Sequence, residues 1–475
     1  MDDFLTIAEA ARLIAAKQLS PVELTKELLG RAKRLNPVLH AFIRITEERA
    51  LADAAAAEAR IMRDGPKGPL DGIPIAHKDI YNTKGITTTA HSKLLEDFVP
   101  AQDATTVRLL AEAGTVMLGK LSTHEFAMGG PSFDLPWPPA RNPWNPDHNP
   151  GGSSSGTGAG VAAGLFLGGT GSDTGGSIRS PAALCGIAGI KPTYGLCSRV
   201  GVQPLSYTLD HTGPMAWTAE DCAILLQAMA GHDSADPASA DRPVPDFRAG
   251  LGHGVKGLRI GVARTWHETE VPVSEATAKG IADAIETFGK LGADICDVSP
   301  PRLREFQAAT FVILSAEAFA VHEPWLKTRF NDYGELLRDR LALGGLVSGP
   351  DYVQATRRRR ELCQQMAAAM VDVDVLLTAS QPTEAVRIDS VPKWSLMGTP
   401  GFTNPANLTG YPAMSICSGF GASGLPVAIQ LVAKPFQEAM LFRVADSYET
   451  TMPWRQSRPA LAREAVAEKE RVAAQ

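Results

Sequence analysis

The sequence predicts an α/β fold, and three observations support this. From residue 66 onward, short apolar runs of strand length alternate with helical stretches, a pattern typical of a sheet covered by helices. The chain shows no internal repeat, and segments of different composition interleave along its 475 residues. Although a chain of this length suggests roughly three domains of about 150 residues, we therefore expect a single domain over residues 1–475.

Residues 1–65 are expected to form the N-terminal helices. Ser20-Pro21-Val22-Glu23 has the pattern of a helix start, with an N-cap serine and a proline at the first helical position. An alanine-rich helix is expected over residues 46–63, ending before Gly65-Pro66.

The remaining elements follow in order. Residues 66–230 are expected to form the core that carries the chemistry, residues 231–256 a surface loop rich in Asp, Pro, Ala and Gly, and residues 257–475 the rest of the sheet, pocket elements and C-terminal helices. Strands are expected at residues 73–76, 116–118, 258–263 and 373–378, and an antiparallel pair at 414–417 and 426–432. Helices are expected at residues 105–113, 352–370, 438–448 and 463–475.

Charge argues against direct nucleic-acid binding. The net charge is −6 with a pI of about 6.0, so the overall basic field of nucleic-acid binders is lacking. The only dense basic run, Arg357 to Arg360, is followed by Glu361 and fits a solvated helix face.

The sequence also favours a cytoplasmic protein without a metal or cofactor. Its six cysteines are scattered and form no CxxC pair, as expected for reduced thiols. The first ten residues lack the pattern of a secretory signal, and no apolar run reaches the ~18 residues of a membrane helix. The ten histidines form no HExxH motif.

Glycine is concentrated in one segment, with 11 glycines between Gly151 and Gly176. A flexible linker does not fit, because the apolar residues 161–167 lie inside the segment. A phosphate loop would need a lysine where Thr157 stands, and the loose GxGxxA at residues 158–163 lacks a clear preceding strand. A nucleophile elbow at residues 152–156 stays open, with His322 as the only histidine nominated as its base.

A fourth interpretation uses several motifs in order. These are GIPIAHKD at residues 72–79, PGGSSSG at 150–156, GSDTGGSIRSP at 171–181, GIKPTYG at 189–195, LDHTGP at 209–214 and, more weakly, NPANLTG at 404–410. On these motifs the chain resembles the amidase signature family of serine hydrolases, strongly over residues 70–215. The resemblance implies an α/β/α layered fold with a mixed, mostly parallel central sheet flanked by helices.

The resemblance further implies a Ser–Ser–Lys triad. Ser177 would be the nucleophile, Ser153 the bridging serine after a cis peptide bond, and Lys78 the terminal base. A serine needs an adjacent base, and a lysine serves only when neutral. The pKa of Lys78 would therefore have to fall ~3 units, about 4 kcal/mol, which burial can supply. His77 stands where the family usually has a small apolar residue, and its role is open.

Further roles follow from the same resemblance. Backbone N–H groups of Thr174, Gly175, Gly176 and Ser177 would form the oxyanion hole. Asp173 and Arg179 would brace this loop as an ion pair, with Ser154 as a supporting hydrogen-bonding residue. Met128, Gly129 and Gly130 would line the substrate pocket. Judged from the residues alone, residues 133–144, with Trp137 and Trp144, either roof an apolar acyl group or form a proline-rich surface loop packed by the two tryptophans, and residues 394–402 are a candidate for another wall.

The sequence thus favours a hydrolase of carboxylic amide C–N bonds that acts on a small molecule through an acyl-enzyme. A carbamate or ester substrate and a homodimer remain open. The alternative is the glutaminase component of a tRNA-dependent amidotransferase, its A subunit, which would work with partner subunits. That subfamily usually has a tyrosine–glycine–arginine element where residues 330–335 lack an arginine, and an acidic residue where residues 399–401 have none. We therefore rank the stand-alone amidase first. A catalytically inactive binding protein is disfavoured because all three triad positions are filled.

Overall fold

A computed structural model describes residues 4–394 and 397–473. In this part of the chain the strands form one eleven-stranded sheet in the order β1-β3-β2-β4-β6-β5-β10-β11-β9-β7-β8. The strands are β1 (Phe42–Ile45), β2 (Pro74–Lys78), β3 (Val116–Leu121), β4 (Gly168–Asp173), β5 (Ala188–Lys191), β6 (His211–Ala216), β7 (Arg259–Val262), β8 (Asp294–Asp297), β9 (Val375–Ala379), β10 (Ala413–Phe420) and β11 (Pro426–Ala433).

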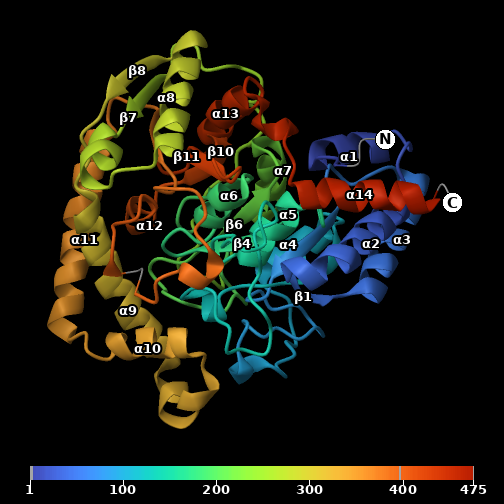
Figure 1. Cartoon of the computed structure of the whole chain (residues 1–475), viewed down its shortest axis with the longest axis horizontal. Coiled ribbons are helices and arrows are strands. Elements are labelled where there is room, and N and C mark those ends of the chain that lie inside the picture. The colour runs from blue at the N-terminus through green and yellow to red at the C-terminus, as the bar shows by residue number, and fades with distance from the viewer. Residues whose placement is uncertain (1–3, 395–396, 474–475) are drawn as a thin grey trace.

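Helices surround this sheet. They are α1 (Ile7–Ala15), α2 (Pro21–Leu39), α3 (Glu47–Asp64), α4 (Thr105–Glu112), α5 (Ser155–Ala162), α6 (Arg179–Cys185), α7 (Ala219–Met229), α8 (Glu275–Lys290), α9 (Leu303–Thr328), α10 (Glu335–Gly344), α11 (Gly349–Ala369), α12 (Asn404–Thr409), α13 (Glu438–Glu449) and α14 (Ala460–Ala473). The last helix returns to lie beside α2, so both chain ends are on the same side of the molecule (Figure 1). No helix among the described residues is long and apolar enough to span a membrane.

The α/β class and most expected elements are confirmed. The expected helices at residues 105–113, 352–370 and 438–448 are α4, α11 and α13, and the expected antiparallel pair is β10 with β11. Ser20 caps α2, because its Oγ accepts from the N–H groups of Val22 and Glu23. Of the expected C-terminal helix at 463–475, the last two residues lie outside the described part of the chain.

The expectation of a mostly parallel sheet is wrong. Only the pairs β2–β3, β2–β4, β7–β8 and β7–β9 are parallel, whereas the other six of the ten pairings between described strands are antiparallel. The centre of the sheet contains β4, β6, β5, β10 and β11, which run alternately up and down. No expected strand range corresponds to β1, β4, β5, β6 or β8. In the case of β1, a four-residue strand between two helices gives too short a pattern.

Glycine in β4 allows helices to pack closely on both faces of the sheet. A Cβ atom at Gly168 would lie 2.6 Å from Leu225 of α7, whereas one at Gly169 would lie 3.1 Å from Thr157 of α5. Successive strand residues point to opposite faces, so α5 and α7 cover opposite faces of β4. Part of the glycine-rich segment is therefore explained by close packing.

The parallel strands β2 and β4 place their carboxyl ends, which carry residues of the candidate site, at one edge of the sheet. Ile75 pairs with Gly168 and Ala76 with Gly169. Because the strands run in the same direction, Lys78 at the end of β2 and Ser172 near the end of β4 emerge at the same edge. The carboxyl ends of parallel strands are where α/β proteins place their ligands.

A buried ion pair lies beside this edge. Lys120 and Asp79 are both fully buried, with Lys120 Nζ 3.2 Å from Asp79 Oδ1. The same ammonium donates to the carbonyl oxygen of Tyr81 (2.6 Å) and to Thr88 Oγ1 (2.7 Å). Asp79 is thus paired with Lys120 and not with its neighbour Lys78, as the alternation of strand side chains predicts.

Replacing Lys120 by Met should destabilise the protein strongly, because it leaves the Asp79 carboxylate buried without its cation. Loss of one partner of a buried pair costs about 3–5 kcal/mol. Chemical denaturation should show this loss, whereas Lys279→Met, which removes the exposed 2.6 Å pair with Asp283, should change stability by less than about 1 kcal/mol. Equal effects of the two substitutions would contradict this expectation.

Candidate active site

The amine of Lys78 lies among three serine hydroxyls. Its Nζ is 2.7 Å from Ser153 Oγ, 3.0 Å from Ser154 Oγ and 2.9 Å from Ser172 Oγ, and the side chain is fully buried. Burial lowers the pKa of Lys78 to about 7, although the charges of Asp173 and Asp210 oppose this shift. Hydroxyls can donate as well as accept, so this environment accommodates a neutral amine.

The neighbouring His77 is neutral as well. Burial lowers its pKa to about 3, with a smaller contribution from the positive charge of Lys120. His77 therefore adds no positive charge beside Lys78 at neutral pH.

Ser153 and Ser177 line one cavity of about 270 Å³. Ser153 lies just before α5 and follows a cis peptide bond from Gly152, and Ser177 lies between β4 and α6. The two segments are held side by side, because the Ser154 N–H donates to the Ser177 carbonyl oxygen at 3.2 Å. The hydroxyl that contacts Lys78 and the proposed nucleophile therefore border the same space.

Gly152 is required by its close approach to His124. A Cβ atom at this position would lie 2.1 Å from His124 Cε1, so any side chain would displace the imidazole ring. The backbone N–H of His124 donates to the Ser153 carbonyl oxygen at 3.1 Å. Burial lowers the pKa of His124 to about 3, with nearby Lys78 contributing, and the ring is therefore a neutral part of the cavity wall.

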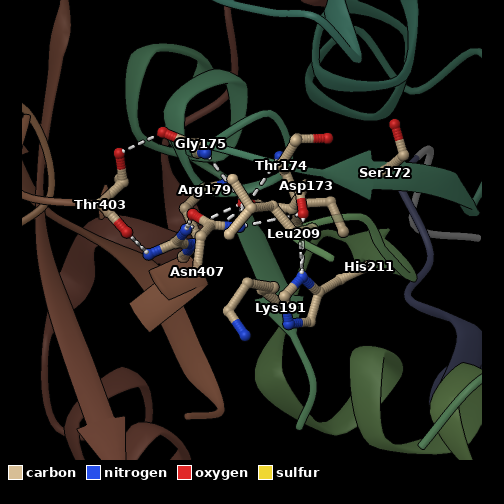
Figure 2. Close-up of polar contacts among 12 residues, drawn as sticks. Ser172, Asp173, Thr174, Gly175, Arg179, Lys191, Leu209, His211, Thr403 and Asn407 are labelled. Atoms are coloured by element: carbon tan, nitrogen blue, oxygen red, sulfur yellow. Dashed lines mark hydrogen bonds and ion pairs between the residues drawn. The ribbon is translucent and has the colours of Figure 1, made fainter. Parts of the chain in front are cut away.

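Asp173 anchors the loop that carries Ser177 (Figure 2). Arg179 donates to both carboxylate oxygens at 2.8 and 3.0 Å, and Asn407 Nδ2 donates to one of them at 2.8 Å. Backbone N–H groups of Gly176 and Ile178 also donate to this carboxylate. Burial alone would raise the pKa of Asp173, but the Arg179 guanidinium holds it well below its usual range.

One of the four expected oxyanion donors is already engaged. The Gly176 N–H donates to Asp173 Oδ1 at 2.8 Å, which corrects its expected role. The N–H groups of Thr174, Gly175 and Ser177 donate to no acceptor within the described chain, and all three residues line the cavity. Thr403 Oγ1 fixes this loop further by donating to the Gly175 carbonyl oxygen at 2.7 Å.

Sequence reasoning missed several residues of this arrangement. Ser172 lies in the motif at residues 171–181, but no role was predicted for it, although its hydroxyl contacts Lys78. Thr403, Asn407 and Gln430 hold the loop or Arg179 from more than 220 residues away. The weak motif at residues 404–410 was the one signal that could have indicated Asn407.

The expected pocket residues divide into two groups. Met128, Gly129 and Gly130 line the cavity beside Ser177, and so do Thr399 and Gly401 from the expected wall at 394–402. Residues 395–396 of that wall lie outside the described part of the chain.

The two tryptophans lie elsewhere. Trp137 is not among the described residues that line the cavity with Ser177. Its ring packs against His91 with centroids 5.8 Å apart. Trp144 packs against Leu184 and Leu425. Since the segment from Phe133 to Trp144 is anchored by these contacts, the expectation that these tryptophans roof the pocket is wrong.

The nucleophile-elbow interpretation loses its nominated base. His322 lies in α9, where its Nδ1 is 2.9 Å from the Tyr333 hydroxyl and its ring packs on Phe126. It is fully buried and is not among the described residues that line the cavity with Ser153 and Ser177.

Comparison with known proteins agrees with the geometry. The family model described as Amidase matches residues 23–442. This chain belongs to the amidase signature family. It is an enzyme of the type that acts on amide C–N bonds.

The relatives include amidotransferase A subunits and a peptide amidase. The chain is 40% identical to the A subunit of the glutamyl-tRNA(Gln) amidotransferase of Pseudomonas syringae pv. tomato, over 96% of this chain and 99% of the relative. The structure of a peptide amidase from Stenotrophomonas maltophilia matches with a TM-score of 0.85 at 30% identity, covering 96% and 98% of the two chains. The corresponding amidotransferase protein from Thermotoga maritima matches with a TM-score of 0.80 at 34% identity, covering 95% of each chain.

The pKa of Lys78 predicts how amide hydrolysis depends on pH. Below about pH 7 the amine is protonated and cannot accept a proton, whereas above it the amine is neutral. We expect kcat/KM to fall about tenfold per pH unit below this pKa and to level off above it. Initial rates between pH 5 and 9 on a cleaved amide would test this, and a flat profile from pH 5 to 8 would count against Lys78 as the base.

Proposed function

We propose that this enzyme hydrolyses carboxylic amides through an acyl-enzyme formed on Ser177. The observation that carries the proposal is the contact of the buried Lys78 amine, with its pKa of about 7, with the Ser153 hydroxyl at 2.7 Å. A neutral amine can accept the proton that a serine must lose to become a nucleophile. Ser153 borders the same cavity as Ser177, which suits it to pass this proton on.

In the proposed reaction, Ser177 Oγ attacks the amide carbonyl carbon. Its proton moves to Ser153 Oγ, and the Ser153 proton moves to Lys78 Nζ. The N–H groups of Thr174, Gly175 and Ser177 donate to the developing oxyanion. The proton then returns through Ser153 to the amide nitrogen, the C–N bond breaks and the amine leaves. Water attacks the acyl-enzyme along the same proton path and releases the acid.

A second candidate is the glutaminase component of a tRNA-dependent amidotransferase. Similarity at 40% identity over nearly full length to the glutamyl-tRNA(Gln) amidotransferase protein supports this candidate more than the stand-alone amidase. Partner subunits would then receive the released ammonia. In either case the six unpaired cysteines fit the reducing cytoplasm.

Ser177→Ala and Lys78→Ala should each abolish turnover, because they remove the nucleophile and the base. Ser180→Ala is a matched control, since Ser180 lines the same cavity three residues further on and should keep most of its activity. A fluorophosphonate probe should label wild type and Ser180→Ala but not Ser177→Ala. Retained turnover in Ser177→Ala would refute the proposal.

The substrate class can be tested with the isolated chain. Ammonia release from glutamine and product release from aryl and alkyl amides should be measured on the same preparation. The relatives predict glutamine hydrolysis that partner subunits enhance, whereas a stand-alone amidase would cleave aryl or alkyl amides without partners. Full activity on aryl or alkyl amides, with no glutamine cleavage, would reject the glutaminase candidate.

A further inference from the structure

The loop of residues 173–177, here called the oxyanion loop, is bordered by cavities on two sides. A second cavity of about 210 Å³ lies next to the one that contains Ser177. Ala127, Thr174 and Leu205 line both cavities. Thr174, which is 2% exposed, thus forms part of the wall between the two cavities. A residue in such a wall needs a specific tether to keep one backbone orientation.

Asp210 provides a tether of this kind. Its Oδ1 accepts a hydrogen bond from Thr174 Oγ1 at 2.6 Å. Its Oδ2 accepts from the backbone N–H groups of Leu205 (2.8 Å) and Ser206 (3.0 Å). One carboxylate therefore connects the oxyanion loop to the turn that also lines both cavities. Hydrogen bonds to a carboxylate are shorter and stronger than those between neutral groups.

The other attachments of the loop hold different atoms. Arg179 and Asn407 hold the Asp173 side chain, and Thr403 holds the Gly175 carbonyl oxygen. Among the described residues, only Asp210 hydrogen-bonds to the Thr174 side chain. Thr174 is also the first of the three proposed oxyanion donors along the chain. The Thr174 side chain is thus held by a contact that no other loop attachment replaces. The peptide plane that carries its N–H is also held through the Asp173 carbonyl oxygen, which accepts from Asn407 Nδ2 at 3.0 Å and lies 3.1 Å from His211 Nδ1.

We propose that Asp210 is a positioning residue that aims the Thr174 N–H at the oxyanion through the Thr174 hydroxyl. This inference rests on the proposed function. An oxyanion forms only in the transition state, so a misdirected donor should lower kcat while leaving substrate binding nearly unchanged. A structural role alone would lower stability without this separation of kcat from KM.

Two variants test the tether. Thr174→Val removes only the hydroxyl at nearly constant volume. Asp210→Asn can keep its amide oxygen on the Leu205 and Ser206 N–H groups, but then it presents an N–H donor to the Thr174 hydroxyl, so a weaker neutral contact of reversed direction replaces the hydrogen bond to the carboxylate. Removal of an oxyanion donor costs about 10²–10³ in kcat, and misorientation should cost a fraction of that. We expect kcat to fall about 10- to 100-fold in each variant with KM within about threefold of wild type. Thr174→Ser keeps the hydroxyl and should stay within about threefold of wild-type kcat.

The double variant Thr174→Val/Asp210→Asn should be no slower than the slower single variant, because both substitutions break the same contact. Asp236→Asn is the matched control, since Asp236 lines the second cavity but pairs with Arg199 at 2.8 Å and has no hydrogen bond to Thr174. The Asp236→Asn variant should keep wild-type kcat even if its melting temperature falls.

Three outcomes would overturn the inference: wild-type kcat in Thr174→Val, multiplicative losses in the double variant, or an equal kcat loss in Asp236→Asn. Ser177→Ala, measured in parallel, separates this inference from the proposed function. If Ser177→Ala is inactive and Thr174→Val is unaffected, only the positioning role fails. If Ser177→Ala is active, the proposed function itself fails.

Discussion

The burial of one lysine amine is the constraint on which the rest of the site depends. Lowering the pKa of Lys78 from 10.5 to about 7 corresponds to about 5 kcal/mol that the ammonium form loses in the folded protein. The charges of Asp173 and Asp210 oppose this shift but do not cancel it. Asp173 is paired with Arg179, and Asp210 accepts from Thr174 and from the N–H groups of Leu205 and Ser206. The Asp173–Arg179 pair therefore serves the site indirectly, because it places a cation beside a carboxylate that would otherwise favour the charged amine.

The Asp173–Arg179 pair also joins distant parts of the chain. Arg179 donates to the Thr403 carbonyl oxygen and to the side chains of Asn407 and Gln430. All of these partners come from the end of the chain that forms α12 and β11. A fully buried guanidinium of this kind must have its donors satisfied, because an unpaired one would be costly. Through Arg179 the oxyanion loop, α12 and the central sheet thus fix one another's positions.

The sequence predicted those parts of the site that lie in continuous motifs. Lys78, Ser153, Ser177 and the Asp173–Arg179 pair fall in short segments, and the structure brings them together at one edge of the sheet. Contacts between segments far apart in the chain were not predictable, since no local pattern specifies that Thr403 will reach Gly175. Trp137 was misplaced for the same reason, because an aromatic residue in a proline-rich loop packs equally well against a pocket or against His91. The balance of parallel and antiparallel strands depends on the order of strands in space, which helix–strand alternation does not encode.

The wide sequence separation of the cavity wall has a consequence for how such an enzyme can be divided or recombined. Residues 66–230 contain all three residues of the proposed triad, yet part of the cavity wall and the Thr403 and Asn407 contacts that hold the oxyanion loop come from residues after 300. A fragment that ended at residue 230 would keep the three proposed catalytic residues but leave the Arg179 guanidinium without Thr403, Asn407 and Gln430. The smallest unit that evolution or a designer can exchange between such enzymes is therefore nearly the entire chain.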